Sequence, residues 1–520
     1  MIPALISVIV AFSIMSTAIV EVTLTNFEVT GNIVKSQQAF NIAEAGLNYY
    51  MWHLNHNSTD YKDGGTTPTT PNPTLGYGPY THNYIDTNGV KEGTYTLWIN
   101  PSGNGSTIVT VRSIGQDNGS NITRTVQAQI GSPSFASYAV ASDSALWFGN
   151  TEAADGPVDS NQGVRMDGAN DSTISSANTT YVPSYQLGGD GSTSEAGVWC
   201  SPSVTSPVNC NTRTKTDWTY PVPSINFNQV SSSLCTIKEV AFAANSSTAS
   251  LDNTSNPCTQ TPATLTSTYL PQRSTSYSLT RGYLIVLNTN GTYNLYDVNA
   301  ENDQLTPYTS ALTLTLVSSN VTVPSAGVIF AEDNVWVLSN PTYHGRLTIA
   351  SGRLNSTDSS TYTNIVIAGP LVYSTKNGSD EVGLIAQNSV IVAPYAPPSS
   401  GAFTYEIDGA LLAENGEVWY PGTYRTNANR CTRGWTSSNQ QLLFYGSVAT
   451  RQTWTWNWLD GTSACGDAVY DSTNGTNNYI SGIQNTTTEY DYNLEYGPPP
   501  SYPLTSGYNI LSWREILTHP

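Results

Sequence analysis

The first twenty residues contain no charged side chain, and this constrains the fold more than any other feature. Met1 to Val20 reads MIPALISVIVAFSIMSTAIV, and the first charge is Glu21. Twenty helical residues span about 30 Å, the thickness of a bilayer core, so the segment can cross a membrane. A cleaved secretory signal would need a basic start, but no Lys or Arg precedes Lys35, so that alternative fits poorly. A plain membrane anchor remains open.

The helical pattern continues to about Leu54. Residues 21–54 are poor in Gly and Pro, and apolar residues recur there at steps of three and four: Phe40, Ala43, Leu47, Tyr50, Met51 and Leu54. We therefore expect one helix of about 54 residues, roughly 80 Å long. Its first half is apolar on every side and must be buried on every side. Outside a membrane, a bundle of copies of itself would do this.

The run AFNIAEAGLNYY at positions 39–50, together with the uncharged start, resembles the type IV pilin superfamily, and within it the minor pilins. The resemblance implies that Met1 is the mature N-terminus and that the apolar helix packs in a filament core. The implied core positions are Met1, Leu5, Ile9, Phe12, Ile19 and Glu21. The implied helix-to-head positions are Phe40, Ala43, Glu44, Leu47, Met51 and Leu54. Leu5 stands where most major pilins carry Glu, which we interpret as a mark of the subtype.

The remainder of the chain predicts an α+β fold that is mainly β. Alternating segments at 93–98, 106–113 and 122–130 predict a small antiparallel sheet on the helix. We expect four parts: the helix at 1–54, with 1–20 as its membrane or filament-core segment, a pilin-like head at 55–132, a loop-rich β region stapled by disulfides at 133–280, and a solenoid-like domain with a C-terminal cap at 281–520. One short helix is expected near 230–244.

Short apolar strands recur after residue 281, often ten to twenty residues apart, with Gly, Asn or Asp between them. This pattern predicts the stacked coils of a β-solenoid, with a β-sandwich as the alternative. The Pro- and Tyr-rich segment 496–503 and the aromatic segment 510–516 are expected to cover the last coil. The expected strands are 284–287, 312–317, 328–330, 335–338, 347–350, 365–368, 382–386, 390–393, 409–412, 418–420 and 442–449.

The six cysteines fall into three pairs that are close in sequence, and none has a CxxC spacing. We expect three local disulfides in an oxidising compartment, Cys200–Cys210, Cys235–Cys258 and Cys431–Cys465, with free buried thiols as the alternative. Asp and Glu number 38 against 19 Lys and Arg, a net charge of −19. Such a chain has little to neutralise a phosphate backbone, which argues against nucleic-acid binding.

Signals for catalysis and for cofactors are weak, so we expect no enzyme. The sequence holds no GxSxG, HExxH, P-loop or GxGxxG motif. His53 and His56 share a helical face, but we expect satisfied or solvent-facing histidines there rather than a metal site. A solenoid could carry a glycan hydrolase, which needs two carboxylates about 5–9 Å apart. The candidates are Asp380/Glu381, Glu406/Asp408 and Glu414/Glu417. The loop 167–171 (DGAND) is a possible Ca²⁺ site, with a simple turn as the alternative.

Glycosylation and adhesion are the remaining candidates. Sequons are scattered through the chain, for example at Asn57, Asn118, Asn121, Asn245, Asn355 and Asn485. Tryptophans cluster at Trp435, Trp454, Trp456 and Trp458. Exposed aromatic rings beside amides suit sugar stacking or protein contact, but they also suit ordinary core packing.

The expected function is that of a structural subunit of an extracellular, type IV pilus-like filament on the cell surface. Its partners would be copies of itself in a helical filament, and the assembly machinery and the inner membrane before assembly. The β-rich body would be exposed for adhesion to a glycan or a cell-surface ligand. The alternatives are a low-copy tip adhesin and a membrane-tethered polysaccharide-degrading enzyme. The family often shows N-terminal methylation, which the residues themselves do not indicate.

Overall fold

The structure is a computed structural model of the 520-residue chain. It describes residues 2–57, 60–102, 106–149, 152–184, 187–201, 216–244, 257–274, 276–397, 401–420, 439–460, 468–471, 476–483 and 485–517. The chain forms two compact units. The first comprises Met1–Ser132 and Gly507–Pro520, and the second comprises Pro133–Ser506. The first unit ends at Ser132, where the sequence analysis places a boundary. The mainly-β α+β fold predicted from the sequence is confirmed.

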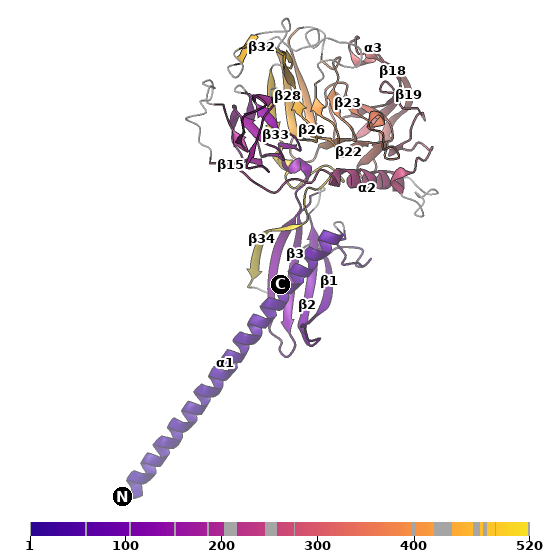
Figure 1. Cartoon of the computed structure of the whole chain (residues 1–520). Coiled ribbons are helices and arrows are strands. Elements are labelled where there is room, and N and C mark those ends of the chain that lie inside the picture. The colour runs from indigo at the N-terminus through magenta and orange to yellow at the C-terminus, as the bar shows by residue number, and fades with distance from the viewer. Residues whose placement is uncertain are drawn as a thin grey trace. The chain divides into compact units, whose positions relative to one another are not determined.

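The first unit consists of one long helix and a five-stranded antiparallel sheet in the order β1-β2-β3-β4-β34. Figure 1 shows α1 continuing past the strands towards the N-terminus. The single helix predicted for residues 1–54 is confirmed. The elements are α1 (Ile2–His56), β1 (Tyr77–Ile85), β2 (Lys91–Pro101), β3 (Val109–Asp117), β4 (Thr123–Gly131) and β34 (Asn509–Ile516).

The second half of α1 packs closely on the sheet. The strands alternate buried and less buried residues, so that one face of β2 and β3 is apolar and meets the helix. The backbones come so close that a Cβ on Gly115 would overlap with Ala39 and Ala43 of α1, and a Cβ on Gly46 would overlap with Ser113 and Tyr95. The buried core of this unit is Ile42, Ala43, Leu47, Tyr50, Leu54, Tyr95, Leu97, Ile99, Val109, Val111, Val126, Ala128, Ile130 and Tyr508.

The prediction that segment 510–516 covers the last coil is wrong. Residues 509–516 form β34, which pairs with β4 at the edge of the first sheet. Trp513 lies opposite Ala128, and Glu515 lies opposite Val126. Pairing satisfies the backbone N–H and C=O groups of β4 that would otherwise be open. Segment 496–503 does contact the coils, since Arg346 donates hydrogen bonds to the carbonyl oxygens of Gly497 and Pro498.

The second unit is built mostly of short strands. The helix predicted near 230–244 is confirmed as α2. The elements are η1 (Phe135–Ser137), β5 (Val140–Ser142), β6 (Leu146–Phe148), β7 (Ala153–Ala154), β8 (Val158–Ser160), β9 (Val164–Met166), β10 (Ala169–Asn170), β11 (Ile174–Ser176), β12 (Thr180–Tyr181), β13 (Glu195–Ala196), β14 (Val198–Trp199), β15 (Trp218–Thr219), α2 (Gln229–Ala243), η3 (Pro257–Thr259), β16 (Tyr269–Leu270), β17 (Gly282–Asn288), β18 (Thr292–Glu301), α3 (Tyr308–Ala311), β19 (Leu312–Thr322), β20 (Val328–Ala331), β21 (Asn334–Asn340), β22 (Arg346–Ser351), η4 (Ser359–Thr361), β23 (Ile365–Ile367), β24 (Glu381–Ala386), β25 (Val390–Val392), β26 (Phe403–Ala413), β27 (Val418–Trp419), β28 (Gln440–Thr450), β29 (Trp454–Thr455), β30 (Asn457–Asp460), β31 (Ala468–Asp471), β32 (Thr476–Gly482), β33 (Thr486–Tyr490) and η5 (Tyr492–Leu494).

Alternate strands of the two large sheets pair in parallel, as the strands of a β-solenoid do, whereas a β-sandwich has antiparallel sheets. Each rung places one strand in an 11-stranded sheet and the next in an 8-stranded sheet, as β22 and β23 or β24 and β25 do. The rungs are in register, so that Val335, Ile365, Val390 and Val418 form one buried row. These stacked rows make the largest core of the unit.

The chain enters this stack in its middle. Strand β5 pairs with β28, so that the 11-stranded sheet runs β15-β11-β8-β5-β28-β26-β24-β22-β20-β16, and β33 also pairs with β28. Residues from the two expected parts at 133–280 and 281–520 therefore share one sheet. Helix α2 packs against β20 and β22. The strands β17, β18 and β19 add an antiparallel edge to the 8-stranded sheet.

Candidate functional site

The first half of α1 is the largest apolar feature at the surface of the first unit. Every residue from Ile2 to Thr30 is exposed, although most of this stretch is apolar and residues 2–20 carry no charge. On soluble monomers, a contiguous exposed apolar patch larger than a few hundred Å² marks an interaction site. The large exposed side chains are Ile2, Leu5, Ile6, Val8, Ile9, Val10, Phe12, Ile14, Met15, Ile19, Val20, Val22, Leu24, Phe27, Val29, Ile33 and Val34.

The predicted filament-core residues lie on this exposed half. Leu5, Ile9, Phe12 and Ile19 are between 56% and 74% exposed, and Glu21 is exposed. Met1 lies outside the described residues. Helix α1 is also long and apolar enough to cross a membrane. The same surface therefore suits a lipid bilayer and a bundle of helices, because both remove it from water.

The predicted helix-to-head residues lie where α1 meets the sheet. Ala43, Leu47 and Leu54 are buried, and Phe40, Glu44 and Met51 are half-buried. The ring of Phe40 lies edge-on to Trp513 with centroids 6.0 Å apart.

Residues far away in sequence complete this contact, and sequence reasoning missed them. The guanidinium of Arg124 lies 5.3 Å from the Phe40 ring centroid and donates to the Ser36 hydroxyl at 2.8 Å. Glu515 of β34 pairs with Arg124. A local pattern in the helix carries no signal for partners on β4 and β34.

The two helix histidines do not converge on one site. His53 Nε2 lies 3.1 Å from Asp60 Oδ2, whereas His56 Nδ1 lies 2.8 Å from the carbonyl oxygen of Trp52. A neighbouring pair joins His82 to Asp63 at 2.6 Å, and Tyr49 donates to Asp63 at 3.0 Å. Burial, with Asp63 next to the hydroxyl, raises the pKa of Tyr49 to about 12. These contacts hold the loop after α1 onto the helix.

Glu406 and Asp408 share one ammonium group. Lys376 Nζ lies 2.7 Å from Glu406 Oε1 and 3.2 Å from Asp408 Oδ1, and it lies 4.3 Å from the centre of the Tyr445 ring. The other oxygen of Asp408 accepts a hydrogen bond from the Tyr373 amide at 2.8 Å. Burial raises the pKa of Asp408 to about 7, and Lys376 acts in the opposite direction. Lys376 thus offsets one negative charge of the pair.

Asp380 and Glu381 are buried and have separate surroundings. Asp380 accepts from the amides of Gly345 and Thr375, each at 2.8 Å, and lies 2.7 Å from His344 Nδ1. Glu381 Oε1 lies 4.0 Å from Arg346 Nη1. Burial, reinforced by the nearby Asp491, raises the pKa of Glu381 to about 9.

The third carboxylate pair is tied to structure as well. Glu414 is buried and accepts a hydrogen bond from the hydroxyl of Ser231 on α2. Burial raises the pKa of Glu414 and of Glu417. Their positions after β26 and before β27 make them turn residues between two strands of one rung.

The loop at 167–171 begins with a fully engaged carboxylate. Asp167 Oδ2 accepts from Arg165 Nε at 2.7 Å and from Trp147 Nε1 at 3.0 Å, and Oδ1 accepts from the Ser201 amide at 2.9 Å. Arg165 itself lies between the rings of Trp147 and Trp199, 4.7 and 5.1 Å from their centres. Asp167 therefore holds a Trp–Arg–Trp ladder across three rungs, and Ca²⁺ would have to displace these donors.

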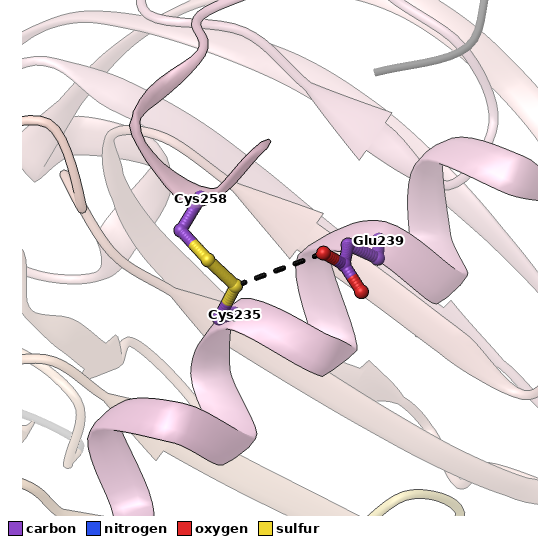
Figure 2. Close-up of side chains that lie close together, drawn as sticks. All are labelled: Cys235, Glu239 and Cys258. Carbon is purple, nitrogen blue, oxygen red and sulfur yellow. Dashed lines mark hydrogen bonds between the residues drawn. A yellow bond between two sulfur atoms is a disulfide. The ribbon is translucent and has the colours of Figure 1, made fainter. Parts of the chain in front are cut away.

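One predicted disulfide joins α2 to the loop that follows it. Figure 2 shows Cys235 bonded to Cys258 beside Glu239, whose Oε1 lies 3.9 Å from Cys235 Sγ. The three groups lie within 4.8 Å of one another. Because the sulfurs are bonded to each other, they are not available as thiolate ligands for a metal ion. Cys200 is disulfide-bonded, while Cys210, Cys431 and Cys465 lie outside the described residues.

The tryptophan cluster is partly a packing feature rather than an exposed aromatic face. Trp456 is 5% exposed and contacts Phe444, and Trp454 contacts Phe148 with ring centroids 5.7 Å apart. Trp435 lies outside the described residues, and Trp458 lies on β30.

The sequons differ in accessibility. Asn57, Asn118, Asn121 and Asn355 are exposed. Asn485 is half-buried and its amide donates to the carbonyl oxygen of Gln440 at 3.1 Å. Asn245 lies outside the described residues.

A shallow groove of about 510 Å³ runs along the turns of the stacked rungs in the second unit. Tyr181 and Leu187 supply apolar surface there, and Asp143 pairs with Arg451 at 3.3 Å across it. The lining residues are Asp143, Ser144, Ala145, Gln162, Tyr181, Val182, Pro183, Ser184, Leu187, Arg451, Gln452 and Thr453. A ring beside amide, hydroxyl and charged groups suits a sugar chain.

Comparison with known proteins gives no family assignment. No protein family model matches the sequence, and no curated protein matches it. Among solved structures, the crystal structure of the competence-associated pilin ComZ from Thermus thermophilus is similar over 93% of this chain and 98% of that chain. The identity is 12% and the TM-score is 0.30.

Proposed function

We propose that the chain is a structural subunit of an extracellular, type IV pilus-like filament. The observation that carries the proposal is the unbroken exposure of α1 from Ile2 to Thr30. Burying one Leu, Ile, Val or Phe side chain contributes about 1.5–3 kcal/mol, so a dozen of them can hold a polymer together. Before assembly, the same segment lies in the cytoplasmic membrane.

Self-assembly through one helix favours an open polymer. Each copy offers the same apolar rod to its neighbours, and a repeated contact that does not close into a ring generates a helical filament. The β-rich second unit then lies outside the core on the cell surface. Copies of the chain are its main partners, and the assembly machinery acts on the membrane-held precursor.

The second unit is proposed to serve adhesion. Its groove at Tyr181 and Arg451 is the observation that favours this role. A low-copy tip adhesin would use the same groove. The copy number separates the two: a main subunit is present along the whole filament, whereas a tip adhesin is found at the ends.

We propose no catalytic role for this chain. The carboxylates expected for a glycan hydrolase are held by Lys376, His344, Arg346 and Ser231. A hydrolase would lose cleavage of its polysaccharide on Glu406→Gln or Asp408→Asn substitution. Release of sugar from any tested polysaccharide by the wild-type protein, abolished in these variants, would overturn this assignment.

Electron microscopy of surface appendages, with mass spectrometry of their main protein, tests the proposal directly. We expect this chain in the main band. Phe12→Lys should abolish the appendages, because it places a charge on the apolar rod, and membrane fractionation of the precursor separates a failure of assembly from a failure of insertion. The matched control is Ile85→Lys on β1, an exposed apolar residue of the head. Appendages that lack this chain, or unchanged appendages with Phe12→Lys, would overturn the proposal.

A further inference from the structure

Three charged residues interrupt the otherwise uncharged part of α1, and they are evenly spaced. Glu21, Glu28 and Lys35 are the charged side chains of residues 2–38, each seven positions from the next. Seven residues make two helical turns to within about 20°, so the three lie along one line of the helix, about 10.5 Å apart. They form a charge stripe of minus, minus and plus towards the head.

The three charges of the stripe form no ion pair with the described residues of their own chain. Ion pairs along a helix join residues three or four positions apart, and no opposite charge stands at that distance from any of the three. A separation of about 10.5 Å is too long for a direct pair within the stripe. Across the part of the chain that the structure describes, none of the three joins an ion pair, and both glutamates are exposed.

A bundle of such helices would enclose these charges. Moving a charge from water into apolar surroundings is unfavourable unless an opposite charge meets it there. Parallel helices in register would place Glu21 against Glu21, Glu28 against Glu28 and Lys35 against Lys35. In that arrangement all three contacts repel.

An axial shift of seven residues removes the conflict. Shifting one copy by seven residues brings its Lys35 level with Glu28 of the next copy. A second equal shift brings Glu21 of a third copy to the same level. The even spacing thus lets one lysine face two glutamates, each from a different copy.

We propose that Lys35 of one copy pairs with Glu28 of a second copy, and with Glu21 of a third, and that this pairing sets the axial offset between neighbouring helices at seven residues. The inference rests on the proposed filament and deepens it by naming the contact and its register. The partner is a second copy of this chain, and the charge complementarity of the stripe selects the offset.

Charge reversal tests the pairing. Lys35→Glu leaves three acidic residues at one level and should lower the number of filaments per cell by at least about tenfold, because a buried charge without its partner is strongly destabilising. Adding Glu28→Lys to the same chain reverses the pair and should restore filaments to within about threefold of wild type. The matched control is Gln37→Glu, an exposed position about 160° away from Lys35 around the helix.

Disulfide cross-linking between copies tests the same contact without depending on the number of filaments. In the double variant Glu28→Cys, Lys35→Cys, the two cysteines of one chain are about 10.5 Å apart, too far for a disulfide within the helix. Oxidised filaments should therefore yield a ladder of linked chains. Thr30→Cys with Lys35→Cys, on different sides of the helix, should yield none.

The outcomes separate the two proposals. If wild-type appendages lack this chain, the proposed function fails. If they contain it, but Lys35→Glu assembles as well as wild type, the charge pairing is wrong and the filament stands. Failure of Glu28→Lys to restore Lys35→Glu, together with the absence of a ladder from the 28/35 cysteine pair, would equally overturn the pairing.

Discussion

Lys238 of α2 and Glu332, which follows β20, form an ion pair that is closed to solvent. Their side chains are 0% and 1% exposed. The ammonium of Lys238 also donates to the carbonyl oxygens of Cys258, at 2.8 Å, and Gln260. Burial lowers the pKa of Lys238 and raises that of Glu332, and each partner opposes the shift of the other. The pair fastens α2 and the loop at its disulfide to the stacked rungs.

Removing one member of this pair should destabilise the second unit. Lys238→Met leaves the buried carboxylate of Glu332 without its ammonium partner, and we expect a loss of about 3–5 kcal/mol. Adding Glu332→Leu removes the orphaned charge and should recover a large part of the loss. Denaturant unfolding of the three proteins measures both effects. A double variant less stable than the single one would contradict the interpretation.

Glu381 should make the second unit less stable as the pH rises. Its pKa is raised from an ordinary 4.5 to about 9, so the folded state holds the proton more tightly than the unfolded state. This contribution is fully present below about pH 4.5 and is lost as the pH rises towards 9, with a limiting slope of about 1.4 kcal/mol per pH unit. Asp491 reinforces this rise of the pKa, whereas Arg346 and the hydrogen bond from the Tyr373 hydroxyl oppose it.

Glu381→Gln should flatten that dependence, since the amide stays neutral. Unfolding free energies measured between pH 5 and pH 9 compare the variant with wild type. The control is Glu489→Gln on β33, an exposed position that should leave the profile unchanged. Equal slopes for Glu381→Gln and wild type would show that Glu381 does not carry the effect.

The close approach of α1 to β3 should not tolerate a methyl group. In Gly115→Ala, the new Cβ would overlap with the backbones of Ala39 and Ala43, and we expect a loss of about 1–3 kcal/mol from overpacking. Gly119→Ala is the control, because its Cβ would meet nothing closer than 3.9 Å. Hydrogen exchange of the amides in β3 and in residues 38–54 measures this loss of stability. Equal protection in the two variants would contradict the prediction.

The contact between Phe40 and Trp513 should stabilise the first unit. Trp513→Ala removes the edge-on ring pair and should lower stability by about 1 kcal/mol or more, because such pairs contribute about 0.5–1.5 kcal/mol beyond the buried area. Leu517→Ala is the control, since Leu517 is 86% exposed. Hydrogen exchange in β4 should rise in the first variant alone. Unchanged exchange there would mean that β34 holds its place without the ring.

Sequence patterns predicted the features that depend on neighbouring residues. The apolar stripe from Phe40 to Leu54 carries helical spacing, and the helix ends at His56, close to the predicted end. The short strands after residue 281 are visible in the sequence as short apolar runs, and several of them lie close to their predicted bounds. Such elements are fixed by local periodicity and burial.

Pairings between distant segments were not predictable in this way. Arg124 and Glu515 are 391 positions apart, and neither residue signals the other. The segment 510–516 contains exposed apolar residues that suit a cap as well as an edge strand, so its placement on β4 needed the structure. Glu406 and Asp408 are neighbours in the sequence, but Lys376, which contacts both carboxylates, is 30 positions away from Glu406.

The junction between β5 and β28 affects how the second unit can be made. The hydroxyl of Ser142 donates to the carbonyl oxygen of Gln452, 310 positions later in the chain. During vectorial synthesis, the strands that leave the ribosome first must wait for almost the whole polypeptide before their neighbouring rung arrives. Strands β5, β8 and β11 can pair with one another early, but the edge of β5 that meets β28 stays open until then. The β5 edge is therefore exposed, as an unpaired strand edge, until residues 440–450 have been made.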